Sequence, residues 1–130
     1  LPKKYGELQK RLISCERSIL ESKKHILMGE WKSAVIALRP FYELVKTTKQ
    51  MSVLRDYLVA AGYSNEAVEE IANVLRGFFD FISKFHHALK KNNVDTNPEI
   101  EAMPEDAQFI YLNCVGLLNL ISKKAKRLGN

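Results

Sequence analysis

The fold is decided by residues 64–89, which read SNEAVEEIANVLRGFFDFISKFHHAL. Apolar side chains recur in this stretch at alternating spacings of three and four, at Val68, Ile71, Leu75, Phe78, Ile82, Phe85 and Leu89. That period places them on one face of an α-helix. Ser64 is a favourable N-cap, and the glutamates that follow it oppose the positive end of the helix dipole. Phe79 and Phe81 widen the stripe, so we expect this helix to be covered on two sides.

Upstream of this helix the same period predicts two more. The first has its apolar face at Leu8, Leu12, Cys15, Ile19 and Ile26, and Gly29 is a natural stop for it. The second begins near Trp31 and runs through Val45, with a kink or break expected at Pro40 because proline removes a backbone donor. Ser52 is expected to cap a short continuation over residues 53–60, which Gly62 ends.

Downstream, residues 92–103 read as a loop, with Asn97-Pro98 as a turn signal. Pro104 suits the first position of a fourth helix. The apolar stripe of that helix is Ala107, Ile110, Cys114, Leu117, Ile121 and Leu128, and Gly129 ends it. Gly77 and Gly116 fall inside helices, where we expect them to mark close helix–helix approach. No segment alternates with period two, so the sequence predicts one all-α domain over residues 1–130, an up-down-up-down four-helix bundle.

Composition sets the outer limits of the prediction. The chain has 130 residues and 46% hydrophobic content, enough for one packed domain. No apolar run approaches the roughly 20 residues of a membrane span. The chain begins at Leu1 without a signal-like segment. We therefore expect either a fragment or a mature form from which a targeting segment has been removed.

The net charge of +5 is unevenly distributed. Residues 1–60 hold 12 Lys and Arg against 6 Asp and Glu, whereas residues 61–130 hold 8 against 9. Such an imbalance favours docking to an acidic surface, although a solvated surface that only maintains solubility fits it equally well. The positive charges are dispersed rather than clustered on one helix, so we do not expect nucleic-acid binding.

Two cysteines, Cys15 and Cys114, both fall on apolar stripes. If the first and last helices are antiparallel neighbours, the two lie at about the same height. A disulfide is then geometrically allowed, and the alternative is a pair of buried free thiols. Without a CxxC spacing they do not predict a zinc site.

The histidines offer little chemistry. His86 and His87 diverge by about 100° on a helix, so they cannot chelate one metal from one face. Either could accept a phosphoryl group, which leaves a histidine phosphotransfer module as a rival reading. His25 reads as a surface residue. We find no nucleophile elbow, phosphate-binding loop or paired-carboxylate site, and therefore expect no enzyme, no metal and no cofactor.

A more specific pattern begins at Trp31, which opens the second helix and is followed at a fixed distance by Leu38-Arg39. The segments after it, in order, are Phe41-Tyr42, Asp56-Tyr57-Leu58, a third helix with Leu75, Phe78, Phe79, Ile82, His87-Ala88 and Lys90-Lys91, and a last helix with Ala107, Tyr111, Val115, Leu118-Asn119, Lys123 and Leu128-Gly129. Over about residues 12–129 this order resembles the PsbQ family, extrinsic subunits of photosystem II. The proline-rich N-terminal extension of the plant proteins is absent and the 92–103 loop is longer, which favours an algal PsbQ-like relative.

The resemblance implies a cofactor-free four-helix bundle in the thylakoid lumen of a chloroplast. Members of the family dock on the photosystem II core and its other extrinsic subunits by charged and polar contacts. They help to retain calcium and chloride at the oxygen-evolving centre. The lumen permits disulfides, which would favour pairing of Cys15 with Cys114.

On this reading the docking candidates are Lys3, Lys4, Lys10, Arg11, Trp31 and Arg39. Trp31 is equally open to a core position at the start of its helix. A third reading is an adaptor bundle that holds a partner helix in a groove. It predicts an exposed apolar strip near Phe79 and Phe81.

Overall fold

The computed structural model describes residues 3–85 and 100–128, and within these residues every regular element is helical. This confirms the predicted all-α class. The elements, with 3₁₀ segments marked η, are η1 (Lys3–Tyr5), α1 (Gly6–Leu27), α2 (Trp31–Ile36), η2 (Arg39–Leu44), α3 (Thr48–Ala60), α4 (Asn65–Ser83) and α5 (Pro104–Leu128). Of the predicted loop, residues 100–103 are non-helical and the rest lies outside the described residues.

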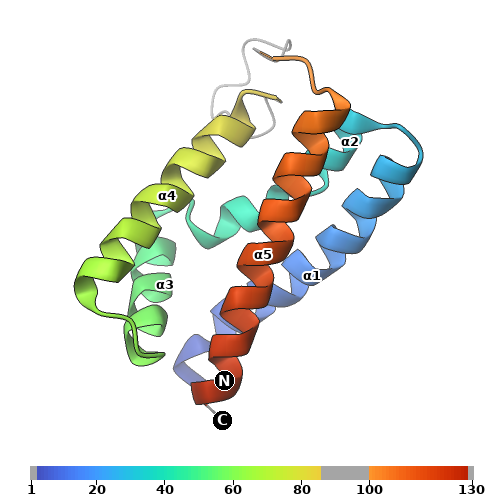
Figure 1. Ribbon diagram of the computed structural model, residues 1–130. Coiled ribbons are helices and arrows are strands. Elements are labelled where there is room, and N and C mark those ends of the chain that lie inside the picture. The colour runs from blue at the N-terminus through green and yellow to red at the C-terminus, as the bar shows by residue number, and fades with distance from the viewer. Residues whose placement is uncertain (1–2, 86–99, 129–130) are drawn as a thin grey trace.

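The helices pack in two groups, which form the two sides of the molecule. α5 packs against α1 and α2, whereas α4 packs against α3. η2 contacts both α1 and α3 and so links the two sides. In Figure 1, α5 runs down the middle of the view with α4 on its left and α1 on its right. None of the described helices is long and apolar enough to cross a membrane.

The second predicted helix is broken, as expected, at Pro40. The α-helix ends at Ile36, and a 3₁₀ segment with Pro40 in its first turn follows. Proline lacks the N–H that an α-helix would need there, and its ring clashes with the preceding turn. The chain therefore changes direction between α2 and α3 instead of continuing along one axis.

The cap of the next helix was predicted wrongly. Thr47, not Ser52, precedes α3, and its Oγ1 accepts a hydrogen bond from the Gln50 backbone N–H at 3.1 Å. In return, the Gln50 side-chain oxygen accepts one from the Thr47 N–H at 3.0 Å. This reciprocal capping box starts a helix in a polar stretch whose residues, taken singly, are weak helix formers. Ser52 is an exposed position inside the helix.

Several other predicted helix ends are confirmed, but α4 ends at Ser83, before the end at Leu89 that its apolar stripe predicted. Ser64 Oγ accepts from the Ala67 N–H at 3.1 Å and begins α4, and Pro104 begins α5. Gly29 and Gly62 follow α1 and α3 with φ values of 74° and 112°, in the left-handed region that glycine adopts without steric cost. The predicted end at Gly129 lies outside the described residues.

The core joins all the helices, with two adjustments to the predicted stripe of α4, the first being that Ala72 is 2% exposed whereas Ile71 is only half-buried. Phe79 is 1% exposed, whereas Phe78 is only half-buried. Tyr5 and Tyr57 meet edge to face at 5.4 Å between ring centroids, which ties the N-terminal turn to α3. Ser22 Oγ donates a 2.8 Å hydrogen bond to the Ala34 carbonyl and joins α1 to α2. The second contact holds α2, the helix that precedes η2, against α1.

Candidate docking site

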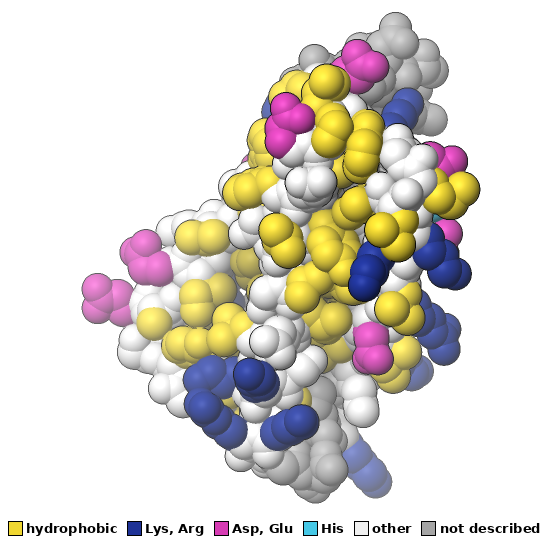
Figure 2. All heavy atoms as spheres, turned by 45° about the vertical axis from the view of Figure 1, so that its right-hand side comes forward, with side chains coloured by type: hydrophobic (Ala, Val, Ile, Leu, Met, Phe, Trp, Pro, Cys, Tyr) yellow, Lys and Arg dark blue, Asp and Glu magenta, His cyan; other side chains and the backbone are white. Residues whose placement is uncertain are grey.

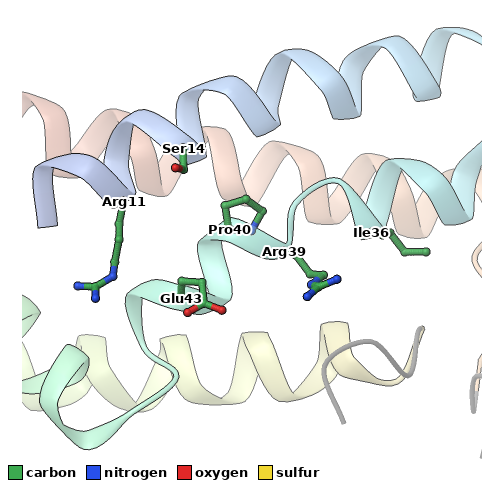
Figure 3. Close-up of a pocket in the computed structure, with 6 residues that line it drawn as sticks. All are labelled: Arg11, Ser14, Ile36, Arg39, Pro40 and Glu43. Atoms are coloured by element: carbon green, nitrogen blue, oxygen red, sulfur yellow. The ribbon is translucent and has the colours of Figure 1, made fainter. Parts of the chain in front are cut away.

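A surface hollow of about 450 Å³ lies where η2 crosses α1 (Figure 3). Its lining comes from three elements: Arg11 and Ser14 from α1, Ile36 from the end of α2, and Arg39, Pro40 and Glu43 from η2. Two of the predicted docking residues, Arg11 and Arg39, are therefore brought to one place although 28 positions separate them in the chain.

The 3₁₀ period explains which residues of η2 reach the hollow. A 3₁₀-helix has three residues per turn, so side chains three apart lie on one face. Leu38, Phe41 and Leu44 have this spacing and are at most 2% exposed, which makes them the buried face. Pro40 and Glu43 are also three positions apart, so they share a face that lies one third of a turn from the buried face. Arg39 comes directly before Pro40 in the chain. Because Leu38, Phe41 and Leu44 are buried, the charged side chains of η2 point outward, to the surface.

The charges in the hollow are unbalanced. Figure 3 shows the Arg11 and Arg39 guanidinium groups and the Glu43 carboxylate on the same side, directed away from α1. Glu43 forms an ion pair with Lys46 at 3.7 Å, whereas no ion pair within the described residues involves Arg11 or Arg39. Arg39 is exposed and Arg11 is half-buried. Two guanidinium groups are consequently available to an anionic partner, to which each can present paired N–H donors.

The other predicted docking residues do not line this hollow. Lys3 and Lys4 lie in η1, where Lys4 Nζ is 3.7 Å from an Asp56 carboxylate oxygen and 5.1 Å from the centre of the Tyr5 ring. Lys10 pairs with Glu7 one turn away at 3.6 Å. Such exposed pairs contribute little to stability, so these lysines remain available as peripheral charge.

Trp31 lies at the edge of the core, which is one of the two positions considered for it, and its docking role stays a prediction. It is half-buried and packs against the core at the start of α2. It therefore supports the turn between α1 and α2 and does not reach the Arg11–Arg39 hollow.

The cysteines lie on α1 and α5 and are both fully buried free thiols. Burial raises the pKa of Cys15 to about 12. Burial also raises the pKa of Cys114, and the proximity of Cys15 adds to that rise. The thiols are therefore neutral at ordinary pH and weak as nucleophiles or metal ligands. A Cys15–Cys114 disulfide remains a prediction for an oxidising compartment.

His25 has a structural role that its sequence context did not indicate. Its Nδ1 is 2.8 Å from Glu30 Oε1 and its Nε2 is 3.3 Å from Glu21 Oε1, so the imidazole bridges two carboxylates across the turn after α1. A histidine with glutamates four before and five after is a weak signal for such a bridge. His86 and His87, the phosphotransfer candidates, lie outside the described residues.

An apolar groove of about 490 Å³ lies between α4 and α5. Its lining residues are Glu70, Ile71, Val74, Leu75, Phe78, Phe109, Asn113, Leu117 and Leu120. Beside it Phe81 is 37% exposed, whereas Phe79 is buried. The strip that the adaptor reading predicts is thus present near Phe81, and α5 supplies half of it. Figure 2 shows hydrophobic side chains gathered down the middle of one face, with Lys and Arg side chains below and to the right.

Within residues 3–85 and 100–128, no three or more His, Cys, Asp or Glu side chains form a cluster that could hold a metal ion. Comparison of the chain with family models, curated proteins and solved structures gives no match. The molecule is thus defined by its all-helical fold, a hollow with two arginines that form no ion pair there, and an apolar groove.

Proposed function

We propose that this chain is a non-catalytic extrinsic subunit that docks on the lumenal face of photosystem II and stabilises the oxygen-evolving complex. Its place would be the thylakoid lumen of a chloroplast, peripheral to the membrane, and its effect would be retention of calcium and chloride. The observation that carries the proposal is the meeting of Arg11 and Arg39 on one hollow. The resemblance to the PsbQ family supplies the identity of the partner.

The docking mechanism follows from the charges. A carboxylate of an acidic partner segment would enter between α1 and η2 and accept paired N–H bonds from Arg11 or Arg39. Glu43 stays with Lys46 and leaves the two arginines uncompensated. Lys3, Lys4 and Lys10 would add longer-range attraction that guides association and weakens as salt screens it.

The architecture suits this role. We propose that α1, α4 and α5, with α2, η2 and α3 together as the fourth arm, form the up-down bundle expected of the family. The break at Pro40 then has a function, because it lays η2 across α1 and so brings Arg39 and Arg11 to one hollow.

The test is sedimentation of the chain with photosystem II membranes stripped of extrinsic proteins, over a range of salt concentrations. We expect saturable binding at low salt that is lost as salt rises, together with partial recovery of oxygen evolution when calcium and chloride are limiting. Binding without recovery would refute the stabilising role. No binding at low salt would refute the proposal as a whole and direct attention to phosphotransfer by His86 or His87.

A further inference from the structure

The outer face of α5 carries a stripe of exposed residues that the fold of one chain does not use. Its members are Glu105, Phe109, Leu112, Gly116, Leu120, Lys123 and Arg127, all exposed and all within one face at helical spacing. Phe109 is 53% exposed, Leu112 65% and Leu120 37%. Large apolar side chains that gather on one exposed face typically mark an interaction surface.

Gly116 is at the centre of this α5 stripe, and the single chain gives no reason for a glycine there. A Cβ added at Gly116 would meet no atom within 4 Å, so internal packing leaves room for a side chain. Glycine is also among the least favourable residues inside a helix. A glycine at an exposed helix position is explained if another helix backbone approaches it closely from outside.

The α5 stripe is complementary to itself when reversed about Gly116. Glu105 and Arg127 each lie eleven positions from Gly116, on opposite sides. Phe109 and Lys123 each lie seven positions away, and Leu112 and Leu120 four. In an antiparallel pair of α5 helices that cross at Gly116, acid therefore meets base at both ends, leucine meets leucine on either side of the centre, and Phe109 packs along the Lys123 stem.

We propose that two copies of this chain associate through the α5 stripe as an antiparallel, two-fold symmetric dimer with Gly116 at the axis. The interface is isologous, because the same patch of both copies forms it. The acidic first turn and basic last turn of α5 fix the antiparallel direction, since a parallel pair would place like charges together.

Neighbouring residues prepare the α5 stripe for this contact. Phe109 meets Phe78 and Phe81 of α4 edge to face, with centroid distances of 6.3 Å and 6.4 Å. Its ring is therefore held in place before a partner arrives. Val74, 69% exposed on the α4 side of the adjoining groove, extends the apolar area that a second copy can cover. One helix pair is nevertheless a small interface, so we expect a reversible dimer.

The first test is sedimentation equilibrium of the full chain over a wide concentration range. We expect a reversible monomer–dimer equilibrium for the natural sequence. Gly116→Leu should weaken the dimer at least about tenfold, because a side chain at the axis separates the helices. Gly77→Leu is the matched control: Gly77 is also an exposed helix position with nothing within 4 Å of an added Cβ, but it lies on α4 outside the α5 stripe.

The second test uses charge and does not depend on packing. Glu105→Arg alone and Arg127→Glu alone should each weaken self-association, because each places like charges opposite one another. When the two variants are mixed, both charge pairs become opposite again, so a mixed dimer should form more tightly than either variant with itself. Circular dichroism verifies that both variants are folded.

A chain that stays monomeric at the highest concentration would overturn the proposal, and binding of a helical peptide to that monomer would assign the surface to a different partner. A dimer that Gly77→Leu weakens as much as Gly116→Leu would also overturn it. So would a mixture of the two charge variants that gains nothing over the separate ones.

Discussion

The Tyr57 hydroxyl donates a 2.6 Å hydrogen bond to the backbone carbonyl of Ile121, which joins α3 to α5. Both residues are at most 1% exposed, so no water replaces the bond in the folded chain. Because α3 otherwise packs mainly against α4 and η2, this bond helps to hold the two sides of the molecule together.

Removal of that bond should measurably destabilise the fold. Tyr57→Phe deletes only the hydroxyl, and we expect a loss of about 1 kcal/mol in the free energy of unfolding. For a chain of this size the loss corresponds to a melting temperature lower by roughly 3–5 °C. Tyr111→Phe is the control, since no described hydrogen bond uses that hydroxyl. Equal melting temperatures for Tyr57→Phe and the natural chain would contradict this role.

The free energy of unfolding should decrease in alkali. Burial raises the pKa of Tyr57 to about 12, and it raises the pKa of Cys15 to about 12. In the unfolded chain these groups lose protons from their ordinary pKa values of 10.0 and 9.0 upward, so the folded state binds more protons there. The stabilisation is therefore complete below about pH 9 and is lost as pH rises toward 12.

Urea unfolding at pH 8, 9, 10 and 11 measures this decrease. Each group contributes a slope of up to about 1.4 kcal/mol per pH unit above its unfolded pKa. Tyr57→Phe should reduce the slope above pH 10 by removing one titration. A free energy of unfolding that stays constant from pH 8 to 11 would show that these groups are not buried as neutral acids.

The buried thiols should be protected from reagents in the folded chain. Cys15 and Cys114 are both 0% exposed and neutral, and only the thiolate reacts rapidly with iodoacetamide. We expect almost no labelling in buffer at pH 8 and complete labelling of both in denaturant, read by mass spectrometry. Rapid labelling of either cysteine in buffer would refute its place in the core. Protein isolated after oxidation tests the disulfide separately, because a bridge removes two hydrogens from the mass and blocks labelling in denaturant.

The capping box before α3 gives a paired prediction. Thr47→Ala removes the oxygen that accepts from the Gln50 N–H and should cost about 1 kcal/mol of unfolding free energy. Ser52→Ala replaces an exposed serine inside the same helix with the best helix former, so it should be neutral or slightly stabilising. Thermal unfolding of both variants measures the difference. A larger loss from Ser52→Ala would move the start of α3 back to the position first expected.

The helices themselves were largely predictable because their signals are local. Ser64, Pro104 and Gly29 act on neighbouring backbone groups, and Pro40 falls inside an apolar helical pattern, where its missing N–H breaks the helix. The capping box at Thr47 is also local, but it depends on a pair of residues, so judging residues singly missed it. Whether Phe78 or Phe79 enters the core depends on how α4 is rotated about its axis against its neighbours. Hydrophobic periodicity defines that rotation only to within one residue position.

The candidate site was predictable only in its parts. Arg11 and Arg39 were both expected to dock, but their meeting depends on η2 lying across α1, a tertiary contact that no local pattern encodes. The α5 contribution to the apolar groove was missed for the same reason. Phe109 and Leu120 could be placed on a helix face from the sequence, but which face a neighbour covers depends on the packing of the other helices.

The central claim is that Arg11 and Arg39 dock the chain on photosystem II, and a comparison of two charge-matched variants tests it most directly. Arg11→Glu with Arg39→Glu alters the hollow, whereas Arg17→Glu with Lys32→Glu alters exposed positions of α1 and α2 outside it. Both pairs change the net charge equally. Binding isotherms on stripped photosystem II membranes at low salt should show at least about tenfold weaker binding for the first pair and a much smaller change for the second. Equal weakening by the two pairs, or none by the first, would contradict the account.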